Sequence, residues 1–88
     1  MDPASRPIVL EIRVELKPGV LDAEAESVEK SLGLLGISGV RNVRTARIYD
    51  LEFSDATATE AHRRAQEAVD RLLANPVIHR VTIRPLPG

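Results

Sequence analysis

Residues 8–16 alternate between apolar and polar side chains, and this alternation constrains the fold more than any other feature of the chain. A period of two is typical of a β-strand that has one buried face and one solvated face. The turn at Lys17-Pro18-Gly19 then ends the pattern. The sequence therefore predicts a strand that needs a covering layer on one side only. Its inner face consists of Ile8, Leu10, Ile12, Val14 and Leu16.

The next segment has the spacing of an amphipathic helix. Asp22 stands directly before it, where its carboxylate can accept hydrogen bonds from free backbone amides, and Gly36 stands where helices commonly end. We predict a helix over residues 23–35. Its apolar stripe, at intervals of three and four residues, consists of Leu21, Ala25, Val28, Leu32 and Leu35.

A second helix and a last strand are predicted near the C-terminus. Thr57 and Glu60 match a capping box, in which a hydroxyl and a carboxylate each satisfy a backbone amide, and an apolar stripe continues to residue 73. Pro76 disfavours helical structure in the residue before it, so we expect the helix to end at Asn75-Pro76. Alternation then predicts a strand over residues 77–84.

Between the two helices, the pattern of residues 40–53 indicates extended chain. At about 3.3 Å per residue this segment would span about 46 Å, whereas a compact domain of this length is about 30 Å across. The segment therefore either bends into two strands or extends beyond its own subunit. We expect a long central strand that takes part in dimerisation.

The order of these elements predicts an α+β fold. Two one-sided helices on one face of a mostly antiparallel sheet form a two-layer, β-α-β-β-α-β-like arrangement. A chain of 88 residues is long enough for one domain only. We place this domain at residues 8–84, after a flexible N-terminal arm at residues 1–7 and before a C-terminal tail at residues 85–88.

Composition excludes several classes of function. The chain has no cysteine, so it can form no disulfide, no thiolate metal site and no thiol nucleophile. A net charge of −1 and a content of two aromatic residues argue against nucleic-acid binding, which relies on basic surface and base stacking. No apolar run approaches the roughly 20 residues that cross a bilayer, so we expect no membrane partner.

No pattern of catalytic residues stands out. The two histidines, His62 and His79, lack metal-ligand spacing, and the glutamates of the first helix occupy its polar side. The chain has neither a phosphate-binding glycine loop nor a nucleophile elbow. Arg41, Arg44 and Arg47 are the most prominent charges, and polyanion binding, an interface role and simple solubility are all open for them. From the residues alone, the chain is interpreted as a small α+β module without its own active site.

Several stretches nevertheless follow a known pattern. The most specific is Leu-Leu-Ala-Asn-Pro-Val-Ile at residues 72–78, and the turn Gly-Val-Leu-Asp at residues 19–22 is second. Together with Val28, Leu32 and Val43-Arg44, they resemble the PurS family, the small subunit of bacterial and archaeal phosphoribosylformylglycinamidine (FGAM) synthase. The resemblance extends from about residue 8 to residue 83.

This resemblance implies the fourth step of purine synthesis, a carbon–nitrogen ligase reaction with glutamine as the amido donor. ATP activates the formamide oxygen of formylglycinamide ribonucleotide, and ammonia displaces it to give the amidine. A synthetase subunit would carry the ATP chemistry and a glutaminase subunit would release the ammonia. The present chain would be the non-catalytic subunit that joins them. It would bind no cofactor or metal, while the complex would use ATP and Mg.

The resemblance also implies partners and a compartment. We expect a cytoplasmic homodimer, with a tetramer left open, that contacts the synthetase and glutaminase subunits. For these contacts we single out Arg44, Arg47 and the corner Asn75-Pro76-Val77-Ile78, although the corner also suits a purely structural role between helix and strand. The alternative function is a freestanding dimeric, ferredoxin-like regulatory module that binds a small ligand.

Overall fold

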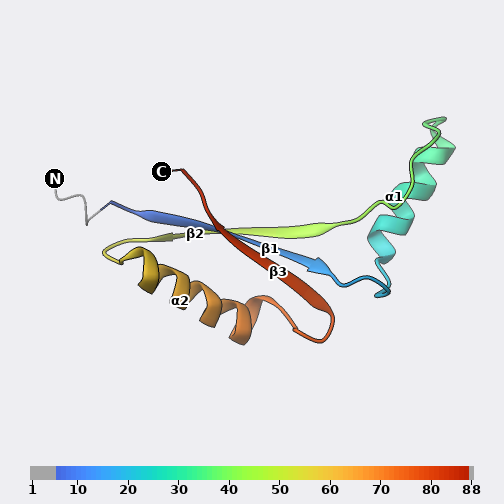
Figure 1. Ribbon diagram of the computed structural model, residues 1–88. Coiled ribbons are helices and arrows are strands. Elements are labelled where there is room, and N and C mark those ends of the chain that lie inside the picture. The colour runs from blue at the N-terminus through green and yellow to red at the C-terminus, as the bar shows by residue number, and fades with distance from the viewer. Residues whose placement is uncertain (1–5, 88) are drawn as a thin grey trace.

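The computed structural model describes residues 6–87 and shows an α+β fold with a three-stranded antiparallel sheet of order β2-β1-β3 (Figure 1). The predicted fold class is confirmed. The predicted arm at residues 1–7 falls largely on residues 1–5, which lie outside the described residues. In chain order the elements are β1 (Ile8–Leu16), α1 (Ala23–Leu34), β2 (Ala46–Phe53), α2 (Ala58–Ala68), the π-helical turn η2 (Val69–Leu73) and β3 (His79–Pro85).

The central strand β1 has the predicted bounds, and its alternation decides which face of the sheet is buried. Leu10, Ile12 and Val14 are buried, and α2 lies over this face (Figure 1). Small side chains at Ala61 and Ala65 allow the helix to approach the strand closely. We call this side the helix-covered face. The side chains partly buried around its core are those of Ile8, Tyr49, Leu51, Phe53, Leu73, Ala74, Val81 and Ile83.

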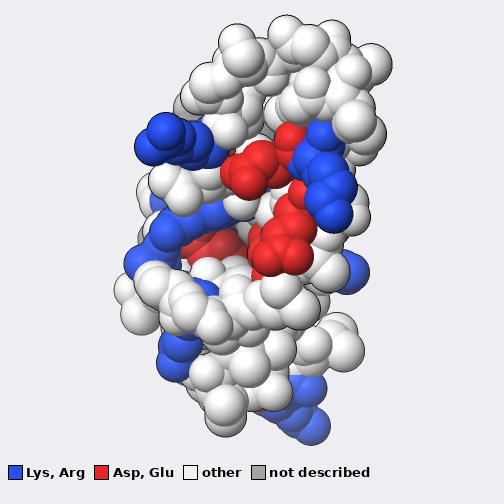
Figure 2. Space-filling model, turned by 90° about the vertical axis from the view of Figure 1, so that its right-hand side faces the viewer, with Lys and Arg blue, Asp and Glu red and all other residues white. Residues whose placement is uncertain are grey.

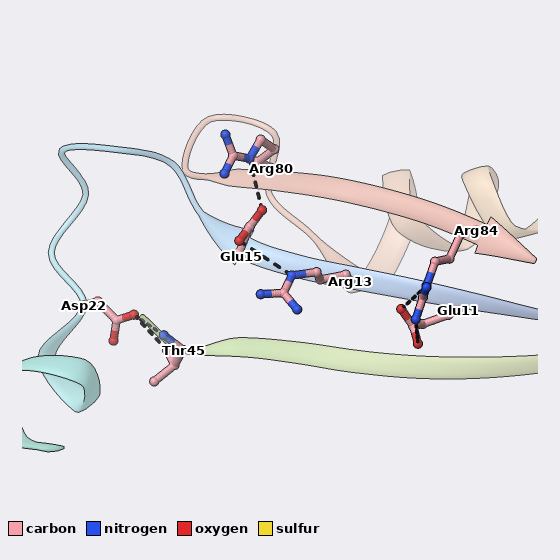
Figure 3. Close-up of polar contacts among 7 residues, drawn as sticks. All are labelled: Glu11, Arg13, Glu15, Asp22, Thr45, Arg80 and Arg84. Carbon is pink, nitrogen blue, oxygen red and sulfur yellow. Dashed lines mark hydrogen bonds and ion pairs between the residues drawn. The ribbon is translucent and has the colours of Figure 1, made fainter. Parts of the chain in front are cut away.

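The opposite, open face of the sheet carries a ladder of ion pairs. Glu11 accepts two hydrogen bonds from Arg84, at 2.8 and 3.2 Å, and Glu15 accepts one from Arg80 at 3.1 Å (Figure 3). The register places each pair directly opposite across β1 and β3. Hydrogen bonding to Arg84 holds the pKa of Glu11 below its usual value. The solvated side of β1 is therefore organised by cross-strand pairs.

α1 lies beyond the end of the sheet, which corrects the predicted placement of both helices on one face (Figure 1). Ala25 is its only buried residue. After α1 the chain turns and returns toward the sheet as irregular extended structure, and β2 begins at Ala46. No hairpin forms within residues 37–53, and β2 is an edge strand that begins only at Ala46, which corrects the prediction of one long central strand over residues 40–53.

Asp22 holds this arrangement in place. Its Oδ1 accepts a hydrogen bond from the Ala25 N–H at 2.9 Å, so the predicted N-cap is confirmed. Its Oδ2 accepts from the N–H and the hydroxyl of Thr45, at 3.0 and 2.8 Å (Figure 3). These bonds, the one from Ala25 foremost, lower the pKa of Asp22. One carboxylate thus caps α1 and fastens the chain that leads into β2.

The C-terminal elements differ from prediction at their limits. The Thr57 hydroxyl accepts from the Glu60 N–H at 3.1 Å, which confirms the predicted cap of α2. The helix widens into η2, where the Ala74 N–H donates to the Val69 carbonyl at 3.2 Å. β3 extends through Pro85, so only residues 86 and 87 of the predicted tail are described after it. None of the helices in residues 6–87 is long and apolar enough to cross a membrane.

Candidate partner-binding surface

The structure brings the predicted contact residues to one end of the sheet. β1 finishes there, with Leu16 paired to His79 on β3 and Val14 paired to Arg47 on β2. The corner at residues 75–78 leads into β3 at this end, and Arg44 lies in the chain that leads into β2. We name this region the sheet-end surface and define it as Lys17, Arg44, Arg47 and residues 75–79.

The corner is a hydrogen-bonded turn built around Asn75. The Asn75 carbonyl accepts from the Ile78 N–H at 3.1 Å and from the His79 N–H at 2.8 Å. Its side-chain Oδ1 accepts from the Val77 N–H at 2.9 Å, and its own N–H donates to Nδ1 of His79 at 2.9 Å. Pro76 occupies the second position of the turn, where its fixed φ is favourable. The corner is therefore rigid.

Lys17 joins this corner to the end of β1. Its N–H donates to the Ile78 carbonyl at 2.8 Å, and its Nζ donates to the Pro76 carbonyl at 2.6 Å. The sequence pattern indicates a turn at Lys17 but does not predict this contact. A signal was available, because Lys17 directly follows the alternating strand, next to which the final strand had to pair.

The corner also presents an apolar side chain to solvent. Val77 is 75% exposed and lies before β3, which corrects the prediction that the last strand begins at this residue. The turn hydrogen bonds occupy residues 75–78, so β3 can begin only at His79. Leu72, on the neighbouring turn η2, is 82% exposed. Apolar groups are thus available for burial beside the charged ones.

Arg44 and Arg47 are both exposed but line different hollows. Arg44 borders a cleft of about 650 Å³ together with Lys17 and Glu29, whereas Arg47 borders one of about 260 Å³ together with His79 and Asp22. Arg44 lies outside any strand, so its orientation does not follow strand alternation. Figure 2 shows the molecule from this side, with acidic groups gathered in the middle and basic groups on either side of them.

These groups suit recognition of another protein. Exposed guanidinium and ammonium groups can donate to carboxylates, and a rigid turn presents its side chains in one geometry. Within residues 6–87, no three His, Asp or Glu side chains are placed to hold a metal ion together.

Comparisons with known proteins identify the family. The family model described as PurS, phosphoribosylformylglycinamidine (FGAM) synthase, matches residues 9–86. The chain is also 37% identical over 76 residues to the FGAM synthase subunit PurS of Archaeoglobus fulgidus. This match covers 86% of this chain and 95% of the A. fulgidus chain. The chain belongs to the PurS family. The resemblance seen at residues 72–78 and 19–22 is thereby confirmed.

Solved PurS structures share the fold. The purS subunit of FGAM synthase (EC 6.3.5.3) from Thermotoga maritima matches with a TM-score of 0.83 at 25% identity, over 92% of this chain and 93% of that chain. PurS from Methanocaldococcus jannaschii matches with a TM-score of 0.79 at 29% identity, over 90% of this chain and 95% of that chain. A PurS-family chain is a subunit of FGAM synthase, so the alternative of a freestanding regulatory module is not favoured.

Proposed function

We propose that this chain is the non-catalytic small subunit of an FGAM synthase and that it joins the synthetase and glutaminase subunits. The observation that carries the proposal is the match to the T. maritima PurLQS structure, with a TM-score of 0.83 over 92% of this chain and 99% of the matched chain. The match spans nearly all of both chains, so the elements described above are the ones that a PurS chain brings to such an assembly.

The sheet-end surface is the proposed contact with the larger subunits. The corner is already held by hydrogen bonds, so binding orders little additional chain. Val77 would gain apolar burial, since it is 75% exposed. Arg44 and Arg47 would donate to carboxylates of a partner.

The remaining parts of the proposal follow from this role. ATP and Mg serve the chemistry of the complex, and this chain binds neither. The chain acts as a homodimer, with a tetramer left open, and it works in the cytoplasm together with the rest of purine biosynthesis.

Assembly is tested by expressing the tagged chain with the synthetase and glutaminase of its own source and recovering it under ATP, Mg and glutamine. We expect all three proteins in one size-exclusion peak. Elution of the chain apart from both larger proteins, under conditions in which each is folded, would overturn the proposal.

The surface is tested by Arg44→Ala and Arg47→Ala. Each should unfold at the wild-type temperature, because exposed charges contribute about 0–1 kcal/mol, yet each should weaken assembly at limiting subunit concentration. Arg63→Ala is the matched control, since Arg63 lies on α2 and is not part of the sheet-end surface, and its side chain is 67% exposed. This variant should assemble normally. If all three variants assemble like wild type, the two arginines serve only solubility.

A further inference from the structure

β3 lies at an edge of the sheet and pairs with β1 on one side only. The Leu86 N–H donates to the Val9 carbonyl at 2.9 Å, so the even-numbered residues of this segment are the ones that bond β1. In an antiparallel ladder, the residues between them direct their N–H and C=O groups away from the neighbouring strand. The N–H groups of Val81 and Ile83 therefore point outward from the sheet.

This outer edge is closed only at its two ends. Pro85 has no N–H, and the His79 N–H donates to the Asn75 carbonyl at 2.8 Å. Between these ends, the N–H groups of Val81 and Ile83 have no backbone partner within residues 6–87. An edge with free donors and acceptors is a template for one more strand.

On the helix-covered face, a hollow of about 200 Å³ lies beside this edge. Its apolar members are Val69, Ala74 and Val81, and its polar members, Gln66 and Asp70, are bonded to each other at 3.0 Å. A strand laid beside β3 would direct every second side chain to this face. Those side chains should be apolar, because the hollow offers apolar contact and room for one of them.

On the open face, the same edge is basic. Arg80 and Arg84 lie there on either side of Thr82, with side chains 51% and 63% exposed. Their bonds to Glu15 and Glu11 use one and two of the five N–H groups of each guanidinium, so both retain donors. The side chains that an added strand directs to this face should therefore be acidic.

We propose that β3 receives an added strand from one of the larger FGAM synthase subunits, an extended segment in which apolar and acidic residues alternate. This rests on the assembly of the proposed function and identifies a contact beside the sheet-end surface. The two contacts are continuous, because Pro76 and His79 belong to that surface and also border the hollow. A second copy is disfavoured as the occupant, since paired β3 strands would crowd four arginines along one seam.

The first test compares hydrogen exchange at single residues in the isolated chain and in the three-protein complex. The N–H groups of Val81 and Ile83 should exchange rapidly in the isolated chain and about tenfold or more slowly in the complex. Thr82 is the internal control, because its N–H faces β1 and should be protected in both. Protection of Val81 and Ile83 in the isolated chain would show that a second copy covers the edge, and would overturn the proposal.

The second test removes one outward N–H. Val81→Pro deletes this donor, and proline is tolerated in an edge strand where the N–H faces away from the ladder. Val81→Ala is the matched control, because it shortens the side chain and keeps the donor. Val81→Pro should raise the Kd of assembly about tenfold or more above that of Val81→Ala. Equal Kd values for the two variants, both folded by circular dichroism, would overturn strand pairing.

The third test concerns charge and uses the exposed position of Thr82. Thr82→Asp should raise the Kd of assembly about fivefold or more, because it opposes an acidic strand, whereas Thr82→Lys should not weaken assembly. Thr82 is opposite Arg13 on β1, so the aspartate is compatible with the fold. Weaker assembly with Thr82→Lys than with Thr82→Asp would contradict the acidic pattern.

The outcomes separate the two claims. If the wild-type chain forms no three-protein complex, the proposed function and the added strand are overturned together. If the complex forms and Val81 and Ile83 exchange as rapidly in it as in the isolated chain, the added strand alone is overturned.

Discussion

Truncation of Ile12 to alanine measures how much the helix-covered face contributes to stability. Ile12 is 0% exposed at the centre of the sheet, beneath Ala61 and Ala65 of α2. Three carbon groups are lost at about 0.8 kcal/mol each, and a cavity adds to this because the two alanines are too short to fill it. We expect a loss of about 3–4 kcal/mol. A domain of this length is stable by about 4–13 kcal/mol, so the variant should be marginal.

Ile48→Ala is the matched control for this change. Ile48 lies on β2 opposite Arg13, on the open face, and is 47% exposed, so the same truncation should cost about 1 kcal/mol or less. Both losses are read from urea unfolding by circular dichroism at one fixed protein concentration, because dimer dissociation is coupled to unfolding. Equal losses at the two positions would refute the assignment of the buried face.

Three further outcomes are expected. The lowered pKa of Asp22 means that its carboxylate stabilises the fold above the unfolded-state pKa and loses this effect as pH falls through the folded-state pKa. Asp22→Asn should therefore reduce hydrogen-exchange protection in α1 at pH 7 but not well below about pH 3.9, and a difference independent of pH would contradict this. Pro76→Ala should lower the free energy of unfolding by about 0.4–1 kcal/mol, because proline suits this turn position and alanine gives the unfolded chain more conformational freedom. An unchanged urea midpoint would count against this expectation. The isolated chain should hydrolyse neither glutamine nor ATP, and turnover by the pure protein in either assay would overturn its non-catalytic role.

Local structure was predictable where one chemical pattern decides it. The alternation of residues 8–16 predicts β1 to the residue, and the side chains of Asp22 and Thr57 predict the starts of α1 and α2. Each of these signals lies within a few residues of the structure it specifies. The family was also predictable, because the stretch at residues 72–78 is specific.

Long-range placement was not predictable in the same way. An amphipathic stripe shows that α1 must be covered but not by which molecule, so placing it on its own sheet was the economical assumption and was wrong. The second role of Asp22, its bonds to Thr45, joins residues 23 positions apart and leaves no local signature. The role of Lys17 at the corner likewise depends on the pairing of β1 with β3.

The claim that this chain is a working subunit of FGAM synthase is tested most directly by reconstitution. Purified synthetase and glutaminase from the same source are given formylglycinamide ribonucleotide, ATP, Mg and glutamine, and the chain is titrated in while amidine formation is followed. The account predicts that glutamine-dependent amidine formation rises with added chain and saturates at a fixed subunit ratio. A full glutamine-dependent rate in the absence of the chain, unchanged by its addition, would contradict the account.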